Sequence, residues 1–111
     1  MADYVIKAHD QLPSIQASLT TAAGAVDLTG ATAVAFIMQP AAGGAAKVNA
    51  PGVIVSPATS GTVRYDWAVG DTNTAGDYQA EWQVTWSDGR HQSFPTVGYH
   101  SITIAPDLVG V

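Results

Sequence analysis

Cysteine is absent from the 111 residues of the chain. This absence excludes a disulfide framework and any metal site built from thiolates. The stability of the fold must therefore come from its core and from contacts with neighbouring molecules. A protein of this composition suits a reducing cytoplasm.

Charged residues are scarce, at 12% of the chain, and positive ones are the scarcer. Four Lys and Arg against nine Asp and Glu give a formal net charge of −5. A negative protein gains nothing from the counterion release that drives phosphate binding, so no nucleic-acid partner is expected. A free monomer usually keeps a more charged surface, which favours assembly with protein partners.

Long apolar runs are also missing. No apolar stretch approaches the roughly 20 residues that cross a bilayer, so no membrane association is expected. Asp3, Lys7, His9 and Asp10 interrupt the N-terminal region, which lacks the pattern of a secretory signal. Hydrophobic residues still make up 47% of the chain, enough for one folded domain over residues 1–111.

Apolar and polar residues alternate with a period of two between turn signals, and no helical spacing persists. The predicted fold class is all-β, an immunoglobulin-like β-sandwich of about seven to eight antiparallel strands. A short arm at residues 1–10 and a tail at residues 106–111 are expected to flank it. Strands are expected over residues 14–19, 31–39, 47–55, 62–67, 78–86 and 99–104. Pro51 places the third of these at a sheet edge or a bulge.

The strand over residues 78–86 has the clearest alternation. One of its faces carries Tyr78, Ala80, Trp82, Val84 and Trp86, while the other carries Gln, Glu and Thr. The first face is therefore expected in the core, together with Trp67 and Phe36.

A tight turn follows this strand at Asp88 and Gly89, where glycine supplies a positive φ. A three-residue loop over residues 87–89 with a glycine bulge would place Trp82 opposite Phe94 on the returning strand. A two-residue loop would misplace Phe94.

Residues 71–80 (DTNTAGDYQA) are similar to the tyrosine-corner segment of immunoglobulin domains, in which a Tyr precedes a core position by two residues. The ring of Tyr78 is expected to be buried and its hydroxyl to bond backbone at the preceding loop. Ala80 stands where such domains usually have Cys, so a disulfide between the sheets is excluded.

A wider set of segments carries a narrower resemblance: LPSI at 12–15, VDLTGAT at 26–32, FIM at 36–38, GTVRYDW at 61–67 and GDYQAEW at 76–82. Together they resemble the N-terminal immunoglobulin-like domain of bacteriophage baseplate upper proteins over most of residues 11–106. The resemblance implies a non-enzymatic virion protein of the tail or baseplate, made in the host cytoplasm. Its partners would be other virion proteins, in a homo-oligomer or symmetric array. Capsid decoration and neck proteins remain the alternative.

Other kinds of site are weaker candidates. The histidines His9, His91 and His100 fall on different predicted strands or ends, so neither an enzyme nor a cofactor is expected. His91 and His100 could bind a metal ion together only if the register of their strands brought the two rings close to each other. Exposed positions on the strands are the favoured interpretation of both residues. No metal site is predicted.

Acidic loops and tryptophans leave two further alternatives. Asp66, Asp71 and Asp77 could gather around calcium, although turn-capping roles are favoured for them. Trp67, Trp82 and Trp86 could stack on sugars of a host glycan, but their alternation favours the core. For partner binding, the candidates are the edge strand at residues 47–55, the Ala- and Gly-rich loop at residues 40–46, and the termini.

Overall fold

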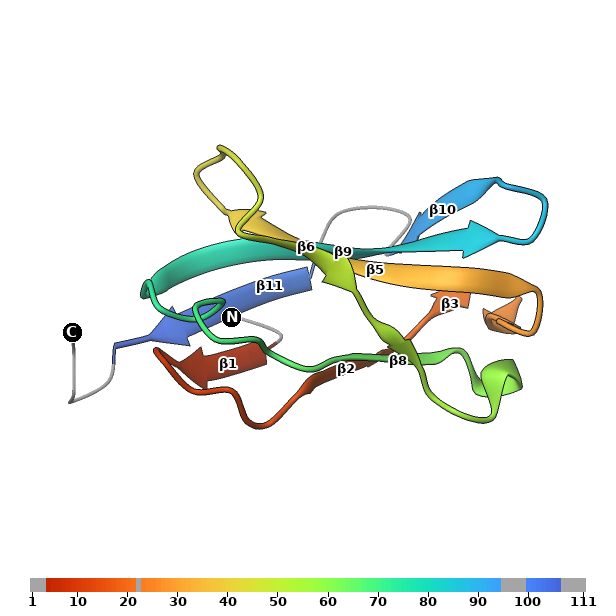
Figure 1. Cartoon of the computed structure of the whole chain (residues 1–111), viewed down its shortest axis with the longest axis horizontal. Helices are drawn as coiled ribbons and strands as arrows, with labels where there is room; N and C mark the ends of the chain where they lie inside the picture. The colour runs from red at the N-terminus through yellow and green to blue at the C-terminus, as the bar shows by residue number, and fades with distance from the viewer. Residues whose placement is uncertain (1–3, 22, 95–99, 107–111) are drawn as a thin grey trace.

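The computed structural model describes residues 4–21, 23–94 and 100–106. They contain strands and one short 3-10 helix, η1, and no α-helix occurs within these ranges. The strands are β1 (Tyr4–Lys7), β2 (Ile15–Ser18), β3 (Thr20–Thr21), β4 (Gly24–Ala25), β5 (Ala31–Pro40), β6 (Val48–Pro51), β7 (Val53–Ile54), β8 (Thr62–Tyr65), β9 (Gly76–Trp86), β10 (His91–Phe94) and β11 (His100–Ala105), with η1 at Ala58–Ser60 (Figure 1). The predicted all-β class is confirmed.

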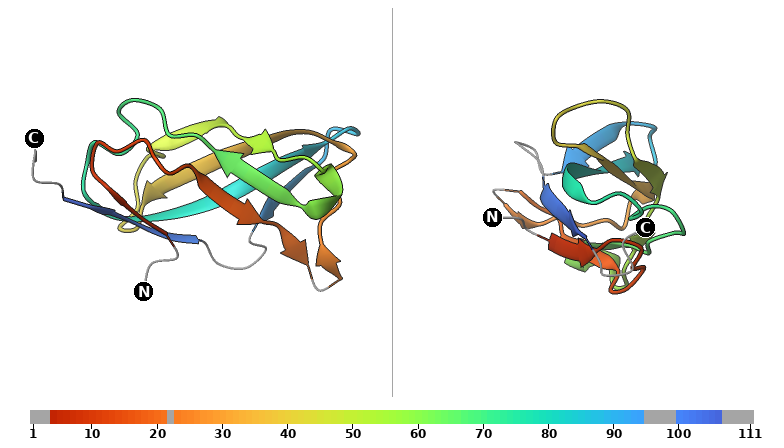
Figure 2. Two further views of the ribbon diagram at one scale, coloured as in Figure 1. Left: turned by 90° about the horizontal axis from the view of Figure 1, so that it is seen from below. Right: turned by 90° about the vertical axis from the view of Figure 1, so that its left-hand side faces the viewer.

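The strands form three sheets. The largest has the order β1-β11-β9-β5-β6, and β10 also pairs with β9. The second has the order β2-β8-β7, and β3 and β4 form a small hairpin. Figure 2 shows the second sheet covering one face of the largest one.

The beginning of the described chain differs from the prediction. Residues 4–7, predicted as part of an arm, form β1, which runs parallel to β11 and pairs Tyr4 with Ile102 and Lys7 with Ala105. The expectation of purely antiparallel strands is therefore wrong at this edge. The pairing buries Ile6, which is 4% exposed. A four-residue alternation is too short to identify a strand from the sequence alone.

Strand β9 is the centre of the largest sheet. One of its edges pairs with β5 along almost its whole length, interrupted by a bulge at Thr32. Its other edge is shared, because β10 pairs with residues 82–85 and β11 with residues 76–80. The two strands thus follow one another along β9. The predicted last strand is β11, and its predicted first residue, Tyr99, lies outside the described residues.

The strand predicted over residues 47–55 is divided between two sheets. Its first part, β6, forms the edge of the largest sheet beside β5, and its second part, β7, pairs with β8. Gly52 lies at the crossing and donates a hydrogen bond of 2.7 Å to the carbonyl oxygen of Val34. Pro51 therefore ends the edge strand, in agreement with its predicted edge position.

Aromatic side chains join the two larger sheets. Phe36 on β5 stacks on Tyr65 of β8, with ring centroids 4.9 Å apart and an interplanar angle of 18°. Trp67 meets Phe36 edge-on at 5.6 Å, and Trp82 contacts it at 4.8 Å. Each such pair contributes about 0.5–1.5 kcal/mol beyond the burial of its surface. Phe36 is thus the centre of the core.

Among the described residues, no helix has the length and apolar character that a membrane span requires.

Candidate functional site

Most residues predicted for the core lie where the alternation placed them. Phe36, Trp82 and Val84 are 0% exposed. Ala80, Tyr78 and Trp67 are also buried. Trp86 differs, because it is only partly buried and packs against the rim of the core.

The three tryptophans do not form a common platform. Trp67 and Trp82 lie in the core against Phe36, whereas Trp86 stands at the far end of β9. A sugar-stacking surface that uses all three rings is therefore excluded. Only Trp86 can present part of its ring to a ligand.

Tyr78 forms the predicted corner. Its hydroxyl donates a hydrogen bond of 2.7 Å to the carbonyl oxygen of Thr74 in the loop before β9. Burial raises the pKa of the Tyr78 phenol above its usual value. The phenol therefore stays protonated and ties the loop to the strand.

A second tyrosine interaction at this end was not foreseen. Tyr65 donates a hydrogen bond to the carboxylate of Asp71, which also accepts one of 2.8 Å from the backbone N–H of Ala68. Burial raises the pKa of Tyr65, and the hydrogen bond and charge of Asp71 raise it further. The sequence predicted a strand over residues 62–67, but no local pattern links Tyr65 to an acid six residues later.

The acidic residues considered for calcium are dispersed over different contacts. Asp66 accepts hydrogen bonds from Ser14 and Arg64. Asp71 accepts one from the backbone N–H of Ala68, and Asp77 accepts one from Thr103. No group of three or more His, Cys, Asp or Glu able to hold a metal occurs within residues 4–21, 23–94 and 100–106. Their contacts are those of turn-capping and strand-pairing acids.

The histidines are likewise separated. His91 pairs with Thr85 on β9, whereas His100 pairs with Ala80, five residues earlier in the same strand. Five residues of strand span roughly 16 Å, so the two rings cannot share a metal ion. His9 lies in the turn after β1, where its φ is +71°.

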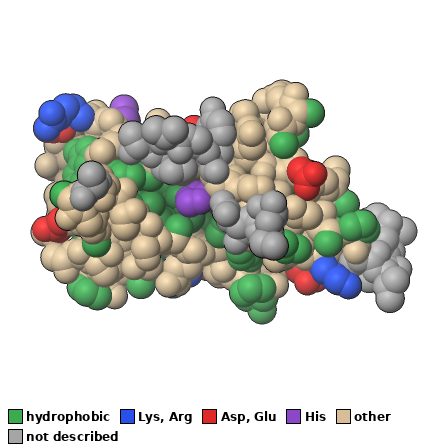
Figure 3. Space-filling model, turned by 180° about the vertical axis from the view of Figure 1, so that it is seen from behind, with side chains coloured by type: hydrophobic (Ala, Val, Ile, Leu, Met, Phe, Trp, Pro, Cys, Tyr) green, Lys and Arg blue, Asp and Glu red, His purple; other side chains and the backbone are tan. Residues whose placement is uncertain are grey.

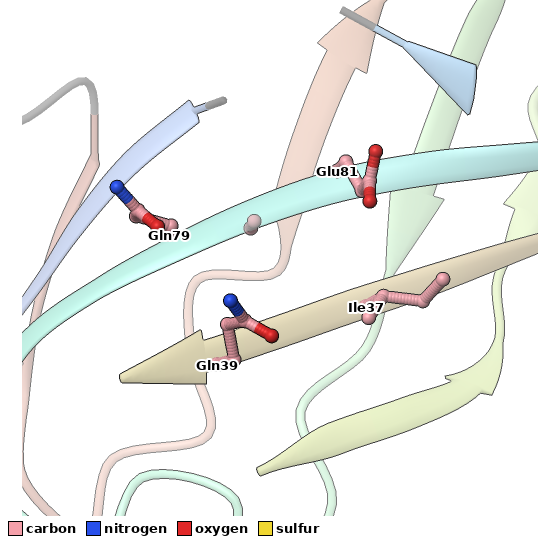
Figure 4. A pocket seen from close by; sticks show the side chains of 5 residues that line it. Ile37, Gln39, Gln79 and Glu81 are labelled. Carbon is pink, nitrogen blue, oxygen red and sulfur yellow. The ribbon is translucent and has the colours of Figure 1, made fainter. Parts of the chain in front are cut away.

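The outer face of the largest sheet is broad and weakly charged. Outward-facing residues alternate with buried ones along β5 and β9, and among the outward ones on these two strands only Asp77 and Glu81 carry charge. Ile37 and Gln39 of β5 lie beside Glu81 and Gln79 of β9 and line a shallow hollow there (Figure 4). On the face drawn in Figure 3, charged side chains are also few and scattered. Such a surface can contact protein without desolvating many charges.

The partner-binding segments predicted from the sequence lie at one border of this face. Strand β6 is the edge of the largest sheet, and the loop at residues 41–46 that precedes it is exposed. Lys47, just before β6, is held by hydrogen bonds from Nζ to Gly70 O at 3.2 Å and Asn73 Oδ1 at 2.8 Å. The termini, at residues 1–3 and 107–111, lie outside the described residues.

The hairpin after β9 has the predicted geometry. Phe94 lies opposite Trp82, and Gly89 has a φ of +88° in the loop. The backbone N–H groups of Trp86 and Gly89 close the turn on Arg90 O and Trp86 O, at 2.8 and 2.9 Å. Asp88 accepts hydrogen bonds from Arg90 N and Arg90 Nε. The turn is therefore well fixed.

Comparison with models of protein families, with curated proteins and with solved structures finds no match to this chain.

Proposed function

We propose that the chain is an immunoglobulin-like β-sandwich that serves as a non-enzymatic structural protein of a bacteriophage particle, in its tail or baseplate. It acts through contacts with other particle proteins or with copies of itself. The assignment to a bacteriophage particle rests on the resemblance of residues 11–106 to baseplate domains. The strand order supports the fold, and the weakly charged outer face of the largest sheet supports the mode of action.

The strand order supports the immunoglobulin-like assignment. In immunoglobulin domains, strands C, F and G share one sheet, and strands B, E and D lie in the other. Here β5, β9 and β11 are neighbours in one sheet, and the order β2-β8-β7 corresponds to B-E-D. The hydrogen bond from Tyr78 to Thr74 O falls at the start of the strand that corresponds to F.

The proposed role in protein contacts rests on the outer face of the largest sheet. This face is uncovered by other described strands, and its two central strands present only Asp77 and Glu81 as charges. Neutral polar side chains such as Gln39 and Gln79 can both donate and accept hydrogen bonds, so they suit contacts with a neighbouring protein. Within the described part of the chain, the histidines and acids are dispersed and supply no convergent catalytic group.

Quantitative mass spectrometry of gradient-purified particles tests the proposal. The chain is expected at several copies per particle, in a fixed ratio to known tail proteins. A copy number close to that of the major capsid protein supports the alternative of a capsid decoration protein. Loss of the chain during purification contradicts both assignments.

A further inference from the structure

A hollow lies beside the hairpin that joins β9 and β10, away from the outer face described above. Trp86, Arg90, His91 and Gln92 line it. Its volume is about 390 Å³. Small-molecule sites usually measure about 300–1,000 Å³ and combine an apolar wall with a few polar groups. The volume of the hollow falls within that range.

Trp86 supplies the apolar wall. It has the inward parity of β9, yet it remains partly exposed at the rim of the core. Its ring packs toward Gly30, whose added Cβ would lie 3.9 Å from Trp86 Cε3. The two backbone hydrogen bonds of the turn hold the residue in place. The ring is therefore a fixed surface on which a ligand can stack without a large loss of side-chain freedom.

Two polar side chains, those of Arg90 and Gln92, lie on the same side of the hairpin as this wall. The side chain of Arg90 is 83% exposed, and its guanidinium has further N–H donors besides the Nε that bonds Asp88. The side chain of His91 contacts Thr85 Oγ1 at 3.1 Å on the other side of the two strands, so its ring does not face Trp86. The amide of Gln92 both donates and accepts. Such groups can pair with several hydroxyls at once.

The charge of the hollow favours a neutral ligand. Asp88 Oδ2 lies 2.7 Å from Arg90 Nε, so the one cation at the hollow is compensated by an adjacent carboxylate. An anionic ligand would gain little from Arg90 and would approach a protein of net charge −5. A ligand rich in hydroxyls, with one apolar face, fits these conditions better.

We infer that this hollow binds a neutral saccharide, with the C–H face of a pyranose ring on Trp86 and its hydroxyls on Arg90 and Gln92. Binding of this kind is independent of the structural role proposed above, because it uses a different surface. The hollow is shallow, so affinity for a single sugar ring is expected in the millimolar range, about 4 kcal/mol.

The test is an NMR titration of the full 111-residue chain, with the indole N–H signals of its three tryptophans as probes. The ligands are methyl β-glucoside, methyl β-galactoside, methyl α-mannoside and N-acetylglucosamine, each to about 50 mM, enough to saturate a millimolar site. The Trp86 signal is expected to move saturably with at least one sugar. The buried Trp67 and Trp82 should stay in place and serve as internal references.

Variants distinguish sugar binding in the hollow from a general effect of the added sugar on the tryptophan signals. Arg90→Ala and Gln92→Ala alter exposed side chains and should weaken binding about five-fold each, the loss expected for one hydrogen bond. Arg64→Ala is the matched control, because Arg64 forms the same type of ion pair with Asp66 on the other sheet. It should leave binding unchanged. A motionless Trp86 signal with all four sugars overturns the inference, as does equal binding by all three variants.

Discussion

The phenol of Tyr78 and the carbonyl oxygen of Thr74 are joined by a hydrogen bond of 2.7 Å that closes the loop leading into β9. Tyr78 is 4% exposed, so its hydroxyl depends on this partner rather than on bulk water. The bond fixes the point at which the chain enters the central strand of the largest sheet. The register of β9 against both β5 and β11 begins here.

Tyr78→Phe should lower the free energy of unfolding by about 1 kcal/mol, because it removes this hydrogen bond and leaves a carbonyl without its donor. Denaturant unfolding followed by tryptophan fluorescence measures the change. Thr74→Ala is the control, since Thr74 contributes its backbone oxygen and should lose much less stability. Equal effects of the two substitutions would show that the bond does not stabilise the corner.

Alkaline pH should destabilise the protein through Tyr65. Burial, the hydrogen bond to Asp71 and the charge of Asp71 raise the pKa of its phenol, whereas the unfolded chain releases this proton near pH 10. The folded state therefore binds more protons above that pH, and the free energy of unfolding falls as pH rises. Unfolding measured between about pH 8 and pH 11 tests this. Tyr65→Phe should show a flatter pH profile, and an unchanged slope would refute the assignment.

Gly52 should not tolerate a side chain. A Cβ there would lie 3.0 Å from Arg64 O, 3.3 Å from Trp82 Cζ3 and 3.4 Å from a Val34 methyl. Gly52→Ala is therefore expected to destabilise the fold by about 1–3 kcal/mol through overpacking. Gly30→Ala, whose Cβ would meet only Trp86 at 3.9 Å, is the control and should change stability little. Thermal unfolding of the two variants makes the comparison.

The outer face of the largest sheet should matter for assembly more than for folding. Gln79→Arg places a bulky cation at the centre of this face and should change the free energy of unfolding by less than about 0.5 kcal/mol. The number of copies per particle should fall several-fold, because the cation must be desolvated at a protein contact. Ser18→Arg, at an exposed position of β2 opposite the uncharged Thr62, is the control and should assemble normally. Normal incorporation of Gln79→Arg argues against a contact at this face.

Much of the fold could be predicted from local patterns in the sequence. The alternation over residues 78–86 identified β9, and the turn at Asp88 and Gly89 fixed the pairing of Trp82 with Phe94. The tyrosine corner followed from the position of Tyr78 in its segment. Each of these features depends on residues close together in the chain, so the sequence displays them directly.

Features that depend on pairing between residues far apart in the sequence could not be predicted from it. The parallel alignment of β1 with β11 joins residues about a hundred positions apart, and nothing in residues 4–7 indicates their partner. The division of residues 47–55 between two sheets follows from the close approach of Gly52 to Val34 and Arg64, which the sequence does not reveal. The partial exposure of Trp86 arises because the rim of the core ends before β9 does. Alternation alone assigned it to the interior.

Cryo-electron microscopy of purified particles tests the central claim most directly. The account predicts density for this chain on the tail or baseplate, in copies related by the particle's symmetry, with the outer face of the largest sheet against a neighbouring protein. Density for the chain on the capsid lattice, or on no part of the particle, would contradict it.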